Sequence, residues 1–270
     1  MRLAITHRTR YDFEDPVVHA LQRLRLTPKS TSGQSIAEWK MELTGAAREL
    51  EYEDHNCNLT TLVAVEPGVQ KVEIECKGII DTNDNGGVIG RHAGHLPLWH
   101  FASQTKLTKP GAGMRALVQG LSAEQNPLDT MHELSARVLD AVTYETGRTD
   151  SDTTAEEAMG AGHGVCQDHA HIFIGCARQL GVPARYVSGY LMMDDRVSQE
   201  AGHAWAEAHI GGLGWVGFDI SNGISPDARY VRVATGCDYA EAAPITGISF
   251  GSHSDRLSVE LEVAQQTADQ

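Results

Sequence analysis

The segment GHGVCQDHAHIF, residues 162–173, places Cys166 among histidines and an aspartate. Gly162 and Gly164 allow a sharp backbone turn before it, and the residues that follow are typical of a helix ending near Leu180. Cys166 is therefore predicted in the first turn of a helix, where free N–H groups and the positive dipole end stabilise a thiolate. The same N–H groups can hold an oxyanion, so the pattern favours a nucleophilic cysteine.

A thiol nucleophile needs a base and a group that orients the base, and residues 202–220 contain both. Their sequence, GHAWAEAHIGGLGWVGFDI, predicts a β-hairpin with His203 on the first strand and Asp219 on the second. Because strand side chains alternate, an odd-length turn or a bulge near GGLG brings Asp219 to the face of His203, diagonal to it. We therefore predict a Cys166–His203–Asp219 triad for acyl transfer, without a metal or other cofactor.

Two other interpretations of Cys166 stay open. His163, Cys166 and His169, with His203 as a fourth group, could bind a metal, but the spacing is not a common zinc pattern and no second Cys/His pair supports it. Cys166 could also be a buried helix cysteine with solvated histidines around it. Cys176 lies ten residues further along the same helix, about 15 Å away, and is expected to pack in the core. The other three cysteines are expected to be structural: Cys57, Cys76 and Cys237.

The elements that must position these groups differ between the two halves of the chain. Residues 1 to about 90 contain short segments with alternating apolar and polar residues, such as VEIECKGII at 72–80, separated by turn signals. In the second half, periodic apolar residues predict helices first, and later segments, including LSVELEVA near the C-terminus, predict strands. The fold class is therefore α+β: an N-terminal antiparallel β-sandwich-like domain over residues 1–95, then helices followed by an antiparallel sheet over residues 105–270.

The cysteine segment, the predicted hairpin and GCDY at residues 236–239 resemble the bacterial transglutaminase-like superfamily, which contains papain-related cysteine enzymes. The first half resembles the N-terminal β domain of one bacterial branch, through HALQRLRLTPKS and DHNCN. The resemblance implies a papain-like core and places the family's cysteine, histidine and aspartate on Cys166, His203 and Asp219. The chain departs from the family at Cys57, where glycine is usual, and at Cys237, where arginine is usual. It also has DISN in place of Asp-Pro-Thr-Asn.

Four residues near these segments have expected supporting roles. Asp168 is expected to brace the start of the cysteine helix, and Tyr144 is a candidate donor to an oxyanion. Trp205 and Trp215 are expected to cover the hairpin.

Composition limits the partners. The net charge is −14 and the sequence pI is about 5.3, so the protein repels phosphate backbones and we expect no nucleic-acid partner. We expect no membrane partner, because no apolar run approaches the ~20 residues that span a bilayer. An odd number of irregularly spaced cysteines predicts reduced thiols, and with no signal-like N-terminus we expect a cytoplasmic protein.

The expected substrate is a peptide or another amide, and the expected reaction is hydrolysis through an acyl-enzyme. Transamidation requires an amine to outcompete water, usually between aromatic walls, and the chain is only 6% aromatic. The segment DTNDNG at residues 81–86 lacks the distal glutamate of a calcium loop. A transglutaminase and a non-catalytic binding module on the same fold remain the alternatives.

Overall fold

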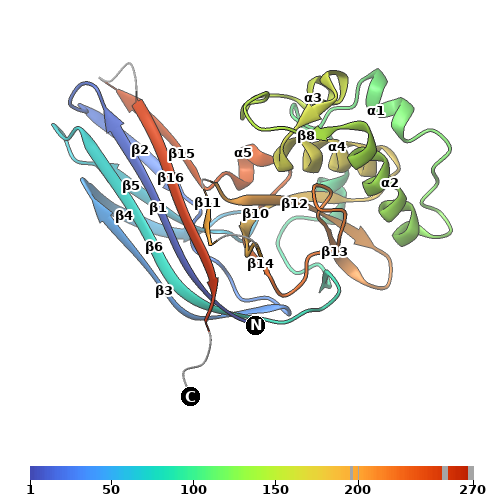
Figure 1. The fold of residues 1–270 in the computed structure, drawn as a ribbon, viewed down its shortest axis with the longest axis horizontal. Coiled ribbons are helices and arrows are strands. Elements are labelled where there is room, and N and C mark those ends of the chain that lie inside the picture. The colour runs from blue at the N-terminus through green and yellow to red at the C-terminus, as the bar shows by residue number, and fades with distance from the viewer. Residues whose placement is uncertain (195–196, 200, 251–254, 267–270) are drawn as a thin grey trace.

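The computed structural model describes residues 1–194, 197–199, 201–250 and 255–266. The molecule has two parts that lie side by side (Figure 1). One part is rich in strands, and in the other, called the second part below, helices surround a further sheet. The strand-rich part contains two antiparallel sheets, with the orders β11-β16-β1-β6-β3 and β15-β2-β5-β4. Their strands are β1 (Arg2–Phe13), β2 (His19–Leu24), β3 (Gln34–Thr44), β4 (Ala46–Glu53), β5 (Leu59–Val65), β6 (Lys71–Thr82), β11 (Ser198–Gln199), β15 (Ile245–Phe250) and β16 (Asp255–Gln265).

These two sheets form the predicted sandwich. Along β6, Val72 and Ile74 are buried while Glu73 and Glu75, which alternate with them, are partly exposed, as the sequence predicts. They pack in one apolar cluster with Leu24 of β2 and Val63 of β5, which belong to the other sheet. The N-terminal antiparallel β domain is therefore confirmed.

The end of the chain returns to the N-terminal sheets, which differs from our expectation. We predicted the C-terminal strand in the sheet of the second half, but β16 pairs with β1 from Leu3↔Gln265 to Phe13↔Asp255, and β15 pairs with β2. The physical reason is that Leu261 and Val263 of β16 bury themselves beside Leu3 in an apolar cluster. Independent folding of residues 1–95 and 105–270 stays a prediction, but strands cross that division.

The second part contains a five-stranded antiparallel sheet of order β14-β10-β12-β13-β7. Its strands are β7 (Val88–Gly90), β10 (Ala184–Leu191), β12 (His203–Ile210), β13 (Gly214–Phe218) and β14 (Tyr230–Gly236), and β8 (Thr143–Tyr144) and β9 (His163–Gly164) form a separate parallel pair. The helices are η1 (Leu98–Ala102), α1 (Ala112–Leu117), α2 (Pro127–Ala141), α3 (Ala155–Ala161), α4 (Cys166–Gln179) and α5 (Tyr239–Ala242). None of the described helices is long and apolar enough to cross a membrane.

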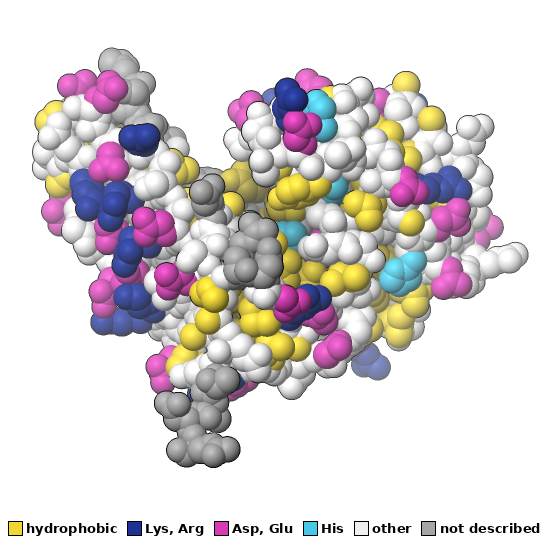
Figure 2. Space-filling model, in the orientation of Figure 1, with side chains coloured by type: hydrophobic (Ala, Val, Ile, Leu, Met, Phe, Trp, Pro, Cys, Tyr) yellow, Lys and Arg dark blue, Asp and Glu magenta, His cyan; other side chains and the backbone are white. Residues whose placement is uncertain are grey.

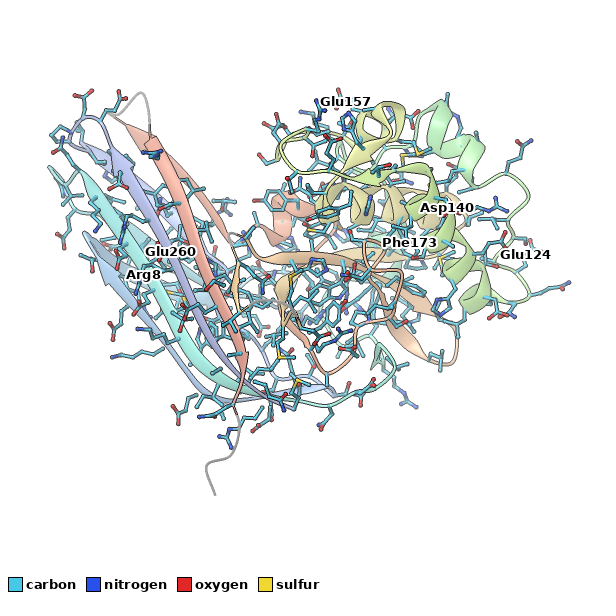
Figure 3. The ribbon with its side chains drawn as sticks, viewed as in Figure 1. Arg8, Glu124, Asp140, Glu157, Phe173 and Glu260 are labelled. Carbon is cyan, nitrogen blue, oxygen red and sulfur yellow. The ribbon has the colours of Figure 1, made fainter. Side chains whose placement is uncertain are left out.

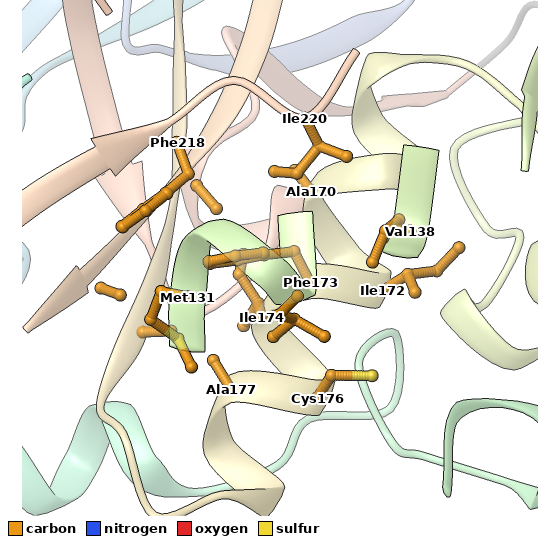
Figure 4. Packing of buried hydrophobic residues seen from close by; sticks show 14 of the residues in the cluster. Met131, Val138, Ala170, Ile172, Phe173, Ile174, Cys176, Ala177, Phe218 and Ile220 are labelled. Carbon is orange, nitrogen blue, oxygen red and sulfur yellow. The ribbon is translucent and has the colours of Figure 1, made fainter. Parts of the chain in front are cut away.

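Helix α4 is the centre of this part. It packs on β12 on one side and on α2 and α3 on the other. Its Phe173 stacks on Phe218 of β13 at 5.1 Å, and both rings belong to one apolar cluster with Met131 and Val138 of α2 (Figure 4). Because nearly every residue of α4 is buried, the position of its first residue is fixed by the core.

Two side-chain amides connect the strand-rich part to the five-stranded sheet of the second part. Gln34 donates to the carbonyl of Arg232 at 2.7 Å and accepts from its N–H at 2.8 Å. Asn58 makes the same pair of bonds with Thr235 at 2.8 and 2.9 Å. Both partners lie on β14, so two buried amides satisfy backbone groups along the edge of this sheet.

Because side chains alternate along a strand, β1 and β16 have a charged outer face and a buried inner face. Arg8 and Glu260 point outward and form an ion pair with an N–O distance of 3.2 Å (Figure 3). Acidic and basic side chains mix over this outer face (Figure 2). The intervening residues of β1, among them His7 and Thr9, are buried on the inner face, which is turned toward the second part.

Candidate active site

The residues before Cys166 place it at the first turn of α4. Gly162 caps the C-terminal end of helix α3 and has the positive φ of 72° that glycine tolerates best. The Asp168 carboxylate accepts the Val165 N–H at 2.8 Å and the Thr149 hydroxyl at 2.7 Å. A Cβ at Gly164 would lie 2.7 Å from the Cβ of Asp168, so this turn requires glycine. Asp168 thus braces the helix start, as expected.

The predicted hairpin brings His203 and Asp219 together. Ile210 pairs with Gly214, so the turn has three residues and an odd length. Asp219 follows β13 and lies diagonal to His203, with its carboxylate oxygen Oδ2 2.6 Å from the imidazole Nε2. The same oxygen accepts the Tyr230 hydroxyl and the Asn222 side-chain amide, each at 2.7 Å.

The Cys166 thiol completes the cluster by hydrogen bonding to the His203 side chain. Because Nε2 of His203 is taken by Asp219, Nδ1 is the ring nitrogen left for the sulfur. Burial alone would lower the pKa of His203, but the hydrogen bonds and charges of Asp219 and Cys166 raise it to about 10. At neutral pH, His203 is therefore an imidazolium, and it lies between the Cys166 sulfur and the Asp219 carboxylate.

Asp219 is built to stay ionised. It has no exposed surface, and burial opposes its charge, but the donors from His203, Asn222 and Tyr230 hold the pKa of this carboxyl below its usual value. Tyr230 and Asn222 were not predicted as site residues. Asn222 could have been found, because it ends the DISN segment where the family pattern also ends in asparagine; Tyr230 had no local signal.

Among the described residues, the four groups of the metal interpretation do not form a ligand cluster. His169 is buried, with Nδ1 2.8 Å from the Ser221 hydroxyl and Nε2 3.1 Å from the carbonyl of Val142, so both ring nitrogens have other partners. Two groups of described residues bring three possible metal ligands within 4.8 Å of one another, and neither contains Cys166. His163 does not belong to either group.

The other aromatic candidates lie around the site rather than in it. Tyr144 pairs with Gly164 in the short β8–β9 sheet, and its role as an oxyanion donor stays a prediction. Trp205 is buried and lies alongside the His203 ring with centroids 6.2 Å apart, while Trp215 is buried under the Arg185 guanidinium. The two tryptophans therefore support the hairpin from within.

A cleft of about 310 Å³ opens beside Cys166 and His203, where the two parts of the molecule meet (Figure 2). Its walls are mostly apolar and include four tyrosines, Tyr11, Tyr186, Tyr190 and Tyr239. One wall belongs to the N-terminal sheet and carries His7, Thr9, Tyr11, Leu257 and Val259. From the sequence we expected the N-terminal domain to shape one wall of the cleft, but not that β16, from the other end of the chain, would form this wall together with β1.

The remaining cysteines lie in different surroundings. Burial raises the pKa of the Cys76 and Cys176 thiols to about 12. Burial, together with nearby Glu241, does the same for Cys237. Cys57 is partly exposed and does not line the cleft. Among the five, Cys166 is the one that has an imidazole partner and access to the cleft.

Comparison with known proteins agrees with this architecture. Residues 115–220, which contain all three predicted site residues, match the transglutaminase-like superfamily, and residues 3–81 match the bacterial transglutaminase-like N-terminal region. An uncharacterized protein of Mycobacterium leprae is 25% identical over 278 residues, covering 98% of this chain and 99% of that protein. An uncharacterized protein of Mycobacterium tuberculosis (strain H37Rv) is 28% identical over 291 residues, covering 97% and 92%.

A crystal structure of a candidate cysteine protease from Cytophaga hutchinsonii has the same fold. It aligns with a TM-score of 0.80 at 21% sequence identity, covering 100% of this chain and 92% of that one. The likeness extends over both the strand-rich part and the second part.

Proposed function

Because this chain belongs to the transglutaminase-like superfamily, we propose that it is a cysteine-dependent amide hydrolase, a peptidase or amidase that works through a thioester. The observation that carries the proposal is the hydrogen-bonded series of thiol, imidazole and buried carboxylate at the mouth of the cleft, formed by Cys166, His203 and Asp219. Geometry of this kind, rather than the fold, is what supports an activity.

The proposed first half-reaction forms the thioester. The Cys166 thiolate attacks the amide carbonyl carbon, a C–S bond forms, and the carbonyl electron pair moves onto oxygen. As the first residue of α4, Cys166 has no intrahelical acceptor for its own N–H, which therefore can donate to the oxyanion. The His203 imidazolium gives its proton to the amide nitrogen, the C–N bond breaks, and the amine leaves.

The second half-reaction consumes water. Neutral His203 accepts a proton from a water molecule while the water oxygen attacks the thioester carbonyl. The C–S bond then breaks, the acid leaves, and the thiolate–imidazolium pair is restored. Asp219 holds the imidazole orientation throughout and stabilises its positive charge.

Transamidation is the second candidate, and the cleft supplies an observation in its favour. Four tyrosines line the space beside Cys166, and aromatic walls can exclude water and hold an amine. In that reaction a primary amine, instead of water, resolves the thioester.

One experiment separates these candidates from each other and from a binding module. A panel of peptide amides is incubated with the protein and a millimolar labelled primary amine, and the free acid and the amine conjugate are quantified by mass spectrometry. Excess free acid supports the hydrolase, whereas excess conjugate identifies a transglutaminase.

The matched variants are Cys166→Ala and Cys57→Gly. The first should abolish both products, and the second, which alters a partly exposed cysteine outside the cleft, should change neither. If an electrophilic peptide analogue binds the cleft but does not modify Cys166, and no substrate of the panel turns over, the protein is a binding module and the proposal is wrong.

A further inference from the structure

A second group of chemically reactive side chains lies outside the cleft. His100 of η1, Cys237 after β14 and Glu241 of α5 bring an imidazole nitrogen, a thiol sulfur and a carboxylate oxygen within 4.8 Å of one another. Neither the proposed hydrolase mechanism nor the family pattern uses this group, and the family pattern has arginine where this chain has Cys237. We propose that these three residues bind a divalent transition-metal ion of the zinc class.

Two buried polar atoms at this cluster have no hydrogen-bond partner among the described residues, which favours a bound ligand. The Nε2 atom of His100 is buried and has no hydrogen-bond partner among the described residues. The neighbouring Asn56 is 9% exposed, and its Nδ2 donates to Glu241 at 2.9 Å, yet its Oδ1 is also buried without a described partner. A buried polar atom without a partner is destabilising, so two of them here, one on the potential ligand His100 and one on its neighbour Asn56, call for an explanation.

The donor set matches the chemistry of zinc. Thiolate, imidazole and carboxylate are its three usual protein ligand types, and three protein ligands leave a fourth position for water. The Cys237 thiol hydrogen-bonds to Glu241. On binding, the metal takes the place of the thiol proton, which is released to solvent. The charges of one thiolate and one carboxylate then balance the two positive charges of the ion.

Other contacts hold the ligands in place before any metal binds. The guanidinium of Arg178 donates to the carbonyl of Phe101 at 2.9 Å and to that of Cys237 at 2.6 Å, so it ties together the two segments that carry His100 and Cys237. Glu241 accepts the Cys237 N–H at 2.8 Å. This positioning reduces the ordering that metal binding would otherwise require.

The site would join three segments that are far apart in sequence. Asn56, which donates to the ligand Glu241, lies between β4 and β5, His100 lies in η1, and Cys237 and Glu241 lie after β14 and in α5. Helix α5, which carries Glu241, begins with Tyr239 of the cleft wall. A bound ion would therefore fix one wall of the cleft without taking part in the chemistry at Cys166.

A rival site provides the internal control. Glu53, Cys57 and His95 also lie within 4.8 Å of one another, but both Glu53 and His95 are exposed. Cys57 has a positive φ of 60°, so Cys57→Gly removes this thiol at a position that suits glycine and should fold well. Loss of metal binding can thus be assigned to one cluster or the other.

The test uses the full chain with Cys166→Ala, which removes the thiol most able to bind metal adventitiously. Metal-free protein is titrated with Co²⁺ while the near-ultraviolet thiolate-to-Co²⁺ charge-transfer band is followed, and Zn²⁺ is then added in competition. We expect one Co²⁺ per chain, displacement by Zn²⁺, and a higher melting temperature with Zn²⁺. Adding Cys237→Ser should abolish the band and weaken binding by about 100-fold or more, whereas adding Cys57→Gly should change neither.

His100→Gln serves as a second variant, because His100 is partly exposed and the change keeps the thiol. It should weaken Co²⁺ binding while keeping the charge-transfer band at saturation. The proposal is overturned if no band appears, if the band survives Cys237→Ser, or if it disappears with Cys57→Gly. Because catalysis is removed from this background, none of these results bears on the proposed hydrolase.

Discussion

Removing the negative charge of Asp219 should have a measurable effect on both the catalytic rate and the pKa of His203. Asp219→Asn keeps the size of the side chain, and an asparagine oxygen in the place of Oδ2 can still accept from His203, Tyr230 and Asn222. The ring should therefore keep its position while it loses the negative charge that favours its protonated form.

The expected magnitude follows from that single loss. A hydrogen bond to a charged group contributes about 1.5–3 kcal/mol, and each 1.36 kcal/mol corresponds to a tenfold change in rate. Losing the charge-assisted bond between His203 and Asp219 should thus lower kcat/KM by at least about 10- to 100-fold. The same change in a Ser-His-Asp triad costs roughly 10⁴-fold, which we take as the upper bound.

The assay is hydrolysis of the best peptide amide found in the panel, together with NMR titration of the His203 ring. Because Asp219 is one of the groups that raise the pKa of His203 to about 10, the variant should titrate at lower pH. Asp54→Asn is the matched control, since Asp54 is also a buried carboxylate, bonded to Arg25 and Asn58 rather than to His203. It should lower the melting temperature while keeping most of the activity.

The result that would refute this reasoning is an Asp219→Asn protein that keeps its kcat/KM within about threefold of the unmodified protein. An unchanged pKa of His203 would be equally damaging, because the buried carboxylate could then not be what holds the imidazolium.

Three further outcomes follow from the structure. Brief iodoacetamide treatment at neutral pH should label Cys166 before any other cysteine, whereas burial raises the pKa of Cys176 to about 12 and should protect it; peptide mapping reads the order. Since His203 must be protonated to expel the amine, kcat/KM should fall as pH rises through the pKa of His203 at about 10, and a rate that keeps increasing there would exclude imidazolium as the acid. A Cβ at Gly189 would lie 2.1 Å from the carbonyl oxygen of Val231, so Gly189→Ala should destabilise the fold by about 3 kcal/mol or more in denaturant unfolding.

The local parts of the candidate site could be predicted because short-range rules govern them. The two glycines before Cys166 and the end of the helix at residue 180 mark where α4 begins and ends. The three-residue turn of the hairpin follows from the position of GGLG, and strand alternation then places Asp219 diagonal to His203. Each of these inferences needs only residues within about 20 positions of one another.

The long-range parts could not be predicted in the same way. The sequence of β16 alternates like any half-buried strand, and nothing in it says that its partner is β1, more than 240 residues earlier. Tyr230 shows the same limit over a short stretch of sequence: it lies 11 residues after Asp219, but β10 and β12 separate its strand β14 from β13 in the sheet, so its contact with Asp219 depends on the order of the strands. Local patterns specify which face of a strand is apolar but leave open which strand it pairs with.

The tyrosines of the cleft bear on the choice between hydrolysis and transamidation. A composition of 6% aromatic residues argues against aromatic walls only if aromatics are spread evenly, and here they are not. Strand β1, strand β10 and helix α5 bring four of the seven tyrosines to one cleft of about 310 Å³. A small, mostly apolar space limits the water that can reach a thioester, which is what an amine acceptor needs in order to compete. Composition therefore no longer favours hydrolysis, and because the same triad serves both reactions, the ratio of free acid to amine conjugate decides between them.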